Sequence, residues 1–170
     1  MNLDDIRLRT AAAADYDQII AVVDDWWGRP IRHALARVFL DHFYATSTIA
    51  ESIPAEDASL VNPAETQAAE LAGFLIGFLS PSQPDAAYIH FVGVHPSLRG
   101  QGLARLLYQR FFALAEANGR ALVSAITAPQ NAGSIAFHTA MGFSVTPPIP
   151  DYDGEGSPKV LFQRRVTTVR

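Results

Sequence analysis

The stretch Val92–Ala104, VGVHPSLRGQGLA, decides the fold of this chain more than any other part of the sequence. An apolar strand ends at Val94, and a basic turn with two glycines, Arg99–Gly102, leads into an amphipathic helix that begins at Leu103. The first turn of a helix has unpaired N–H groups and the positive end of the helix dipole, and glycines let the backbone approach a phosphate closely. Arg99 adds a cation suited to phosphate oxygens. The stretch therefore predicts a pyrophosphate site.

Two common nucleotide-binding motifs do not fit this turn. The dinucleotide fingerprint G-x-G-x-x-G/A would start at Gly100 and would need a small residue where Arg105 stands. The P-loop needs Gly-Lys-Ser/Thr, but the only lysine of the chain, Lys159, lies far away in the sequence.

A third pattern does fit. Arg99, Gly102 and Ala104 match Q/R-x-x-G-x-G/A, and the stretch resembles the acyl-CoA loop of the GNAT superfamily of N-acetyltransferases. The preceding Val94-His95-Pro96 is also typical of that family. An ordinary glycine-containing turn between a strand and a helix remains the alternative.

A second segment, NAGSIAFHTAMGF at residues 131–143, resembles a later motif of the same family, N-x-x-S/A-x-x-F-Y-x-x-x-G-F. Asn131 is a good N-cap for a helix over Ala132–Met141, and Gly142 can adopt the left-handed conformation that ends it. A capped helix without any function is the alternative here. The resemblance covers residues 70–145 well, and the first 45 residues carry no diagnostic motif.

Periodicity predicts an element order, βααβββαβαββ, that resembles the acetyltransferase fold. We expect strands at Ile6–Thr10, Thr46–Ser52, Leu71–Leu79, Ala87–Val94, Arg120–Thr127, Phe143–Pro147 and Lys159–Val166. We expect helices after Asp15, from Pro30 to about Tyr44, from Leu103 to Asn118 and over Ala132–Met141, with a loop at residues 53–66. The predicted class is α/β (α+β): a GNAT fold with a central mixed, mostly antiparallel twisted sheet of about seven strands flanked by about four helices. Residues 1–170 are expected to form a single N-acetyltransferase domain.

Composition and charge exclude several kinds of site and make several kinds of partner less expected. The chain has no cysteine, which excludes disulfides, a thiol nucleophile and a cysteine-ligated metal, and we expect no metal site. Its net charge of −4 argues weakly against nucleic acid as a partner. No apolar run reaches the ~18 residues of a membrane span, and the N-terminus lacks signal-peptide character. We expect a soluble, cytoplasmic enzyme without a membrane partner.

Acetyl transfer to an amine needs a base, and His90 is the first candidate. This stretch carries no acid between Asp85 and Glu116, where many members of the family have a glutamate. The placement of His90, four residues before Val94, resembles arylalkylamine acetyltransferases, in which a histidine on this strand helps to remove the proton through water. A pKa near ~6.5 suits that task at neutral pH. A histidine that only packs in the core is the alternative.

The resemblance also implies the residues that hold the cofactor, acetyl-CoA. The backbone N–H of Val92 maps onto the oxyanion donor and Val94 onto a pantetheine contact, although both valines could simply be core residues. The remaining expected cofactor contacts are Arg99, Gly100, Gln101, Gly102, Leu103, Ala104, Asn131 and Ser134.

His138 stands where the family usually has a tyrosine that acts as the acid. A histidinium could protonate the leaving thiolate, whose pKa is ~8.5. Alternatively, the thiolate leaves unprotonated and His138 only packs beside the cofactor. We keep His138 as a second candidate catalytic residue.

Two loops are expected to cover the acceptor amine, because the fold usually places the acceptor there. Acids could hold an ammonium and aromatic rings could flank it by cation–π contact. The candidate residues are Asp25, Trp26, Trp27 and Tyr152, with Asp24, Asp151 and Asp153 beside them. Core packing of Trp26 and a plain turn at residues 151–154 are the alternatives.

Three functions stay open at this point. The first is an acetyl-CoA-dependent N-acetyltransferase for the primary amine of a small molecule. The second is an N-acetyltransferase for a protein or peptide, and the third is a non-catalytic acyl-CoA-binding module. A homodimer is possible. The sequence does not identify the acceptor, the acyl length or the oligomeric state.

Overall fold

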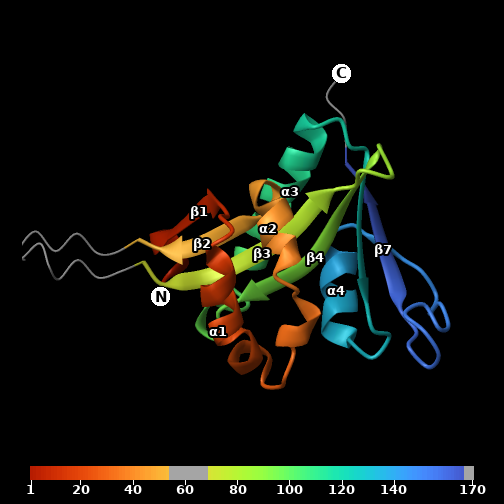
Figure 1. Cartoon of the computed structure of the whole chain (residues 1–170), viewed down its shortest axis with the longest axis horizontal. Helices are drawn as coiled ribbons and strands as arrows, with labels where there is room; N and C mark the ends of the chain where they lie inside the picture. The colour runs from red at the N-terminus through yellow and green to blue at the C-terminus, as the bar shows by residue number, and fades with distance from the viewer. Residues whose placement is uncertain (54–68, 167–170) are drawn as a thin grey trace, which may run out of the picture. The chain divides into compact units, whose positions relative to one another are not determined.

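The computed structural model describes residues 1–53 and 69–166, and its strands form one mixed sheet of seven (Figure 1). The strand order is β1-β2-β3-β4-β5-β7-β6, with β4 and β5 parallel. The strands are β1 Ile6–Thr10, β2 Thr48–Ser52, β3 Leu71–Leu79, β4 Ala86–Val94, β5 Leu122–Thr127, β6 Ser144–Val145 and β7 Val160–Arg165. The α-helices are α1 Asp15–Trp27, α2 Val38–Phe43, α3 Leu103–Ala117 and α4 Ala132–Ala140. This architecture confirms the predicted fold class. The loop expected at residues 53–66 lies almost entirely outside the described residues.

The described residues group into two compact units. The first comprises those within Met1–Ile76 and Phe91–Tyr108, and the second those within Gly77–His90 and Gln109–Arg170. Strands β3 and β4 and helix α3 contribute to both. The single domain over residues 1–170 stays a prediction.

The first unit has its own core between α1 and strands β2 and β3. Ile19 and Val23 lie four residues apart on α1, so they share one face of the helix, and both are fully buried. They cluster with Leu40 from α2, Ile49 from β2 and Phe74 from β3. This packing fixes α1, whose last turn carries both tryptophans of the chain.

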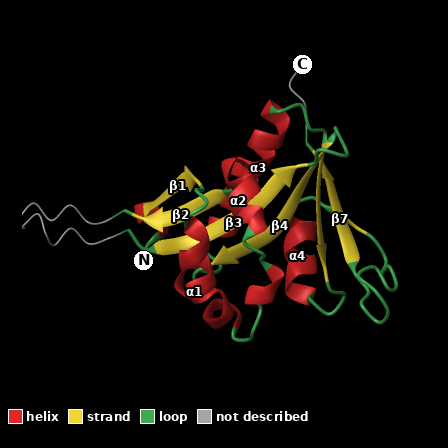
Figure 2. Cartoon of the chain, viewed as in Figure 1, coloured by secondary structure: helices red, strands yellow, loops and turns green. Residues whose placement is uncertain are grey.

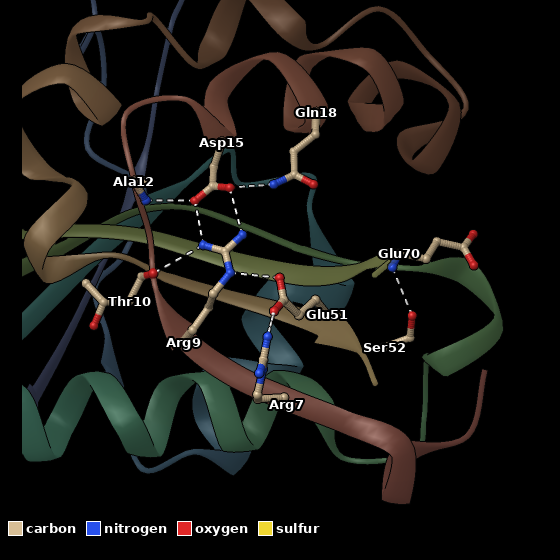
Figure 3. Close-up of polar contacts among 9 residues, drawn as sticks. All are labelled: Arg7, Arg9, Thr10, Ala12, Asp15, Gln18, Glu51, Ser52 and Glu70. Atoms are coloured by element: carbon tan, nitrogen blue, oxygen red, sulfur yellow. Dashed lines mark hydrogen bonds and ion pairs between the residues drawn. The ribbon is translucent and has the colours of Figure 1, made fainter. Parts of the chain in front are cut away.

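A network of ion pairs ties β1 to β2 and to the start of α1 (Figure 3). The Arg9 guanidinium donates two bonds of 2.8 Å to the Asp15 carboxylate and one of 2.7 Å to Glu51. Arg7 donates to the other oxygen of Glu51 at 2.5 Å. Asp15 is the first residue of α1 and accepts from Gln18 and the Ala12 N–H, so it does not occupy the expected N-cap position, which Ala14 takes. The buried carboxylates of this network are thereby paired.

The helix predicted from Pro30 to about Tyr44 is wrong. The segment forms a 3-10 turn, Arg32–Ala34, then α2, and then a second 3-10 turn, Tyr44–Thr46. Leu35 breaks the helix, because it is fully buried in an extended conformation and its carbonyl accepts a 3.3 Å bond from the Tyr16 hydroxyl. Tertiary packing overrides helix propensity at this point.

Aromatic side chains from α3, from the segment after α4 and from β7 pack together in the second unit. Figure 2 shows the helices and strands that carry them. The rings of Phe112 and Phe143 lie 5.8 Å apart, and Phe143 contacts Phe162 of β7 edge to face at 6.5 Å. Arg164 covers the other side of this cluster, with its guanidinium 4.4 Å from the Phe112 ring. The cluster positions α4, whose C-terminal turn contains His138.

Candidate active site

The turn Arg99–Gly102 opens into α3 in the way that the sequence predicts. Gly100 and Gly102 have φ angles of +76° and +99°, which side-chain-bearing residues rarely adopt. A Cβ added at either glycine would meet nothing within 4 Å, so the backbone faces open space there. The fully buried Leu98 and Leu103 anchor the turn on both sides.

The N–H groups at this turn form a donor set that fits a phosphate. Among residues 1–53 and 69–166, none accepts a hydrogen bond from the N–H of Gly102, Leu103 or Ala104. The first turn of α3 contains no acidic residue, so nothing opposes an anion there. The N–H of Gln101 is not part of this donor set, because it donates to the Leu98 carbonyl at 3.4 Å, and the Gln101 side chain donates to the Ser97 carbonyl at 2.7 Å.

The Arg99 side chain is engaged elsewhere. Its Nε donates to the Val94 carbonyl at 3.4 Å, and its terminal nitrogen Nη2 donates to the carbonyl of Trp26 at the end of α1. The phosphate contact expected for the Arg99 guanidinium therefore stays a prediction.

Strand β4 contains one more residue than the matching stretch of β3. The Ser80 N–H donates to the Ala86 carbonyl at 3.0 Å, and the His95 N–H donates to the Ala72 carbonyl at 2.8 Å. The two bonds are eight residues apart on β3, from Ala72 to Ser80, but nine residues apart on β4, from Ala86 to His95. Such an extra residue is a β-bulge, which re-aims the side chains beside it and is common next to active sites.

Ring contacts place the bulge next to His90. Tyr88 lies 5.4 Å from Phe78, and Phe91 lies 6.0 Å from Phe74. Phe74 and Phe78 are four residues apart, so they share one face of β3. Their partners Tyr88 and Phe91 therefore also share a face, although they are only three residues apart in β4. In a regular strand an odd spacing gives opposite faces, so the extra residue lies between Tyr88 and Phe91. Regular alternation along β4 would give Tyr88, His90, Val92 and Val94 one common face, and the bulge breaks that alternation between Tyr88 and Phe91.

The pairing between β4 and β5 is short. It comprises Ala86–Leu122, Ala87–Val123 and Tyr88–Ser124. Both strands are longer than this register, because β4 continues to Val94 and β5 to Thr127. His90 and Val92 thus lie in the part of β4 that the register does not reach.

The C-terminal turn of α1 carries the first group of candidate acceptor residues. Trp26 is only 6% exposed and packs against Phe74 and edge-on against His95. These contacts favour core packing of its ring over acceptor binding. Trp27 is half-buried and stacks on Phe91 at 5.2 Å. Asp25 is exposed.

Asp24 braces the loop that follows this turn. Its carboxylate accepts from the N–H groups of Ile31 and Arg32 at 2.7 and 2.8 Å and from Arg32 Nε at 2.6 Å. The bond from Ile31, followed by the contacts of Arg32, lowers the pKa of Asp24 to about 2. Sequence reasoning missed this role, because a seven-residue spacing between donor and acceptor leaves no local signal.

The loop between β6 and β7 carries the second group of candidate acceptor residues. Asp151 has a φ of +52°, and its carboxylate accepts from the Gly156 N–H at 2.7 Å, which favours the plain-turn alternative for this residue. Asp153 pairs with Lys159 at 3.1 Å. Tyr152 is exposed. Burial raises the pKa of Tyr88 to about 12, and electrostatic interaction with Tyr152 and Asp153 adds to this effect.

Helix α4 begins and ends as predicted. The Asn131 side chain accepts from the Ser134 N–H at 3.1 Å and donates to Thr127 Oγ1 at 3.0 Å, which confirms the N-cap. Gly142 has a φ of +82° just after the helix. The helix is capped and held against β5.

His138 lies buried near the end of α4. Its ring is 6% exposed, and its Nδ1 lies 2.8 Å from the Ser134 carbonyl and 3.3 Å from the Ser134 hydroxyl. Because the carbonyl can only accept, Nδ1 carries the proton of the neutral ring. Burial lowers the pKa of His138, and the bond to Ser134 opposes this only in part. These features favour the packing alternative over an acid role.

The structure thus brings together some of the predicted site residues within each unit. The first unit combines the turn at residues 99–102 with the end of β4 and the two tryptophans. The second combines Asn131, Ser134 and His138 on α4 and its N-cap. In the described part of the chain, no group of three or more metal-binding side chains occurs. No helix in residues 1–53 and 69–166 is both long and apolar enough to span a membrane.

Comparisons with known proteins agree with this geometry. A family model described as "Acetyltransferase (GNAT) family" matches residues 22–143. The chain is 33% identical over 69 residues to L-2,4-diaminobutyric acid acetyltransferase of Nocardia farcinica, a match that covers 41% of this chain and 36% of that protein. It is 41% identical over 61 residues to L-methionine sulfoximine/L-methionine sulfone acetyltransferase of Salmonella typhimurium, which covers 36% of each. The matches span little more than a third of these curated relatives.

Solved structures share the fold over nearly the whole chain. Ard1 from Thermoplasma volcanium has a TM-score of 0.72 at 18% identity and covers 96% of this chain and 99% of its own. The yncA acetyltransferase from Salmonella typhimurium, solved with its cofactor acetyl-CoA, has a TM-score of 0.67 at 19% identity and covers 97% and 96%. At these identities the likeness shows the fold.

Proposed function

This chain belongs to the GNAT acetyltransferase family, and from that premise we propose that it is an acetyl-CoA-dependent N-acetyltransferase that acts on the primary amine of a small molecule. The observation that carries the proposal is the open turn at Gly100–Gly102 and the helix start that follows it, where the N–H groups of Gly102, Leu103 and Ala104 have no partner in the described residues. A helix start of this kind favours an anion such as a pyrophosphate.

Acetyl-CoA fits the donor set at this turn. We assign its pyrophosphate to the N–H groups of Gly102, Leu103 and Ala104. Both glycines of the turn lack a side chain and have open space beside them. When bound, acetyl-CoA supplies an acyl group on a thioester. Val94 is proposed as a pantetheine contact. Asn131 and Ser134 stay predicted cofactor contacts, and their contacts in the structure are those of a helix cap.

His90 is proposed as the base that takes a proton from the acceptor ammonium, directly or through water. The bulge in β4 lies between Tyr88 and Phe91, beside this residue, and a bulge re-aims neighbouring side chains. The N–H of Val92, two residues further, is proposed as the donor to the carbonyl oxygen that gains negative charge during transfer. No acid role is assigned to His138, because it is buried and its lowered pKa keeps it neutral.

A small acceptor is favoured by the two curated relatives, whose names describe acetylation of diaminobutyric acid and of methionine sulfoximine or sulfone. For this chain, we propose that the acceptor lies beside Trp27 and the exposed Asp25 of the α1 turn. Tyr152 stays a separate predicted acceptor residue. The Trp27 ring can flank an alkyl amine, and the carboxylate can hold an ammonium. The cytoplasmic location and a homodimer stay predictions.

The test is release of free coenzyme A thiol from acetyl-CoA in the presence of separate pools of small primary amines, amino acids and peptides. We expect release with one or more small amines and none with peptides alone. Release with peptides only would favour the protein-acetyltransferase alternative. Tight acetyl-CoA binding without release in any pool would favour a non-catalytic acyl-CoA-binding module.

A further inference from the structure

The Arg99 guanidinium joins two segments that lie far apart in the sequence. One of its donors reaches the carbonyl of Trp26, 73 residues away in the chain, and another reaches the carbonyl of Val94 at the end of β4. Both contacts lie within one compact unit. A single side chain therefore connects the end of α1 to the strand that precedes the phosphate turn.

The carbonyl that Arg99 contacts is one that helix geometry leaves without a partner. The last four carbonyls of a helix have no intrahelical donor. At the end of α1, the Asp24 carbonyl accepts from the Arg29 N–H, and the Asp25 carbonyl accepts from the Gly28 N–H. The Trp26 carbonyl accepts from the Arg99 guanidinium. A cation at this position also interacts favourably with the negative end of the helix dipole.

We propose that Arg99 is a positioning residue: it holds the Trp26–Trp27 turn of α1 against the end of β4 and thereby sets the affinity for the acceptor amine more than the affinity for acetyl-CoA. This inference rests on the proposed function for its kinetic part. The turn carries Asp25 and Trp27, both proposed at the acceptor, and the backbone of Arg99 begins the turn that is proposed at the cofactor. The Arg99 side chain is thus placed to hold the proposed acceptor residues of α1 in a fixed position relative to the proposed cofactor turn.

A direct phosphate contact by Arg99 would have different consequences. Removing a phosphate-bound cation weakens acetyl-CoA binding and reduces its dependence on salt, since the interaction is electrostatic. Removing a brace of the α1 turn leaves acetyl-CoA binding nearly unchanged and alters the surroundings of Trp26 and Trp27. Arg99→Gln separates the two cases, because it keeps a neutral donor but removes the charge and the second contact.

Tryptophan fluorescence tests the brace without any substrate. The chain has two tryptophans and both lie in this turn, so the emission spectrum reports on the turn alone. We expect Arg99→Ala and Arg99→Gln to shift the emission to longer wavelength and to raise quenching by acrylamide. Arg105→Ala is the matched control, because Arg105 is an exposed arginine in the first turn of α3 and its side chain has no hydrogen bond to α1 in the described part of the chain. We expect its emission to match that of the native protein.

Kinetics and calorimetry then test the consequence. We expect Arg99→Gln to raise the KM for the amine by roughly tenfold, the scale of one lost bond to a charged group, with kcat and the acetyl-CoA Kd changed much less. Native emission and amine KM, together with a weakened and less salt-dependent acetyl-CoA Kd, would overturn the proposal in favour of phosphate binding. An equal loss in all parameters that follows the melting temperature would also overturn it. If Arg99→Ala does not fold, Arg99→Gln and Arg99→Lys carry the test.

Failure of the proposed function is seen separately. It shows as absence of thiol release by the native protein, whereas failure of this inference shows as native emission and native amine KM in the Arg99 variants.

Discussion

The imidazole of His138 lies flat on the ring of Phe162, with ring centroids 3.8 Å apart and an angle of 6° between the planes. Phe137 and Phe143 meet the same imidazole edge to face at 5.6 and 5.1 Å. Burial among these rings removes water from the imidazole, and this desolvation disfavours its charged form. The packing therefore explains why a histidine can stand where the family has a tyrosine without taking over an acid role.

Replacing His138 by phenylalanine or tyrosine tests this interpretation. We expect both variants to have similar kcat values, each reduced by less than the roughly 10²-fold that loss of a general acid costs. Steady-state rates from mildly acidic to strongly alkaline pH, with melting temperatures, are the measurement. A slow phenylalanine variant beside an active tyrosine variant that works at higher pH would restore the acid role.

The lowered pKa of His138 also predicts how stability depends on pH. In the unfolded chain the ring binds a proton near its ordinary pKa of 6.5, whereas the folded protein binds it only at lower pH. Between these values the unfolded state holds more protons, so the free energy of unfolding falls as pH decreases from about 6.5. Urea unfolding of native protein and His138→Phe at pH 7.5 and 5.5 measures this.

We expect the native protein to lose more stability than His138→Phe over that interval. The other four histidines are present in both proteins, so their contribution cancels in the comparison. Equal losses would show that His138 is as easily protonated in the folded state as in the unfolded one.

Gly102→Asp tests the phosphate turn. The substitution places a carboxylate beside the N–H groups at the start of α3, and we expect acetyl-CoA binding to be abolished in calorimetric titration. Gly102→Asn adds a side chain of the same size without the charge, and it should retain part of the affinity. Gly119→Asp introduces the same residue at another open glycine with positive φ, +71°, at the far end of α3.

The two controls separate charge from backbone strain. Native acetyl-CoA affinity in folded Gly102→Asp would exclude this turn as the phosphate site. Loss of binding in Gly119→Asp as well would show that strain, and not charge, is responsible.

His90→Ala tests the base. We expect the acetyl-CoA Kd to stay close to the native value and kcat to fall by ~10²-fold or more, the usual scale for a general base. The acidic limb of the pH–rate profile should shift or disappear, because it reports titration of the base. An unchanged acidic limb in the variant would assign His90 to the core.

The ion-pair network at β1 predicts unequal roles for two arginines. The Arg9 side chain is 32% exposed and pairs with two buried carboxylates, whereas that of Arg7 is 64% exposed and pairs with one. We expect Arg9→Met to lower the free energy of unfolding by roughly 1.5–3 kcal/mol, as for lost hydrogen bonds to charged groups at a partly exposed site. Arg7→Met should cost about 0–1 kcal/mol, as for a surface pair. Urea unfolding at pH 7 measures both, and equal costs would contradict the ranking.

The same network predicts the response to acid. Burial raises the pKa of Asp15 and of Glu51, but the hydrogen bonds that they accept more than compensate, and both pKa values end up lowered. Their stabilising effect is thus present above the ordinary values of 3.8 and 4.5 and is lost as the pH falls through the lower folded values. The stability difference between native protein and Arg9→Met should narrow below about pH 4.

Features set by neighbouring residues were predictable from the sequence. The bounds of β3, Leu71–Leu79, agree with its apolar run, and α3 begins at Leu103 as its apolar periodicity predicts. The cap at Asn131 and the left-handed conformation of Gly142 likewise follow from local backbone chemistry. The two family motifs identify the fold because each depends only on residues within about a dozen positions.

Only the tertiary structure decided the features that depend on distant partners. The predicted helix after Pro30 is interrupted because burial of Leu35 outweighs its helix propensity. The residue-by-residue alternation of β4 fails at His90 because the strand carries one residue more than its partner β3.

In the candidate site, too, some features follow from neighbouring residues and others depend on distant partners. By itself, the sequence determined that an arginine and two glycines precede a helix start, and hence an open set of N–H donors. Whether the Arg99 guanidinium contacts a phosphate or the end of α1, and whether His138 is charged or stacked on Phe162, depends on which groups the fold brings within 4 Å. Hydrogen bonds and burial act over such short distances that no pattern along the chain encodes them.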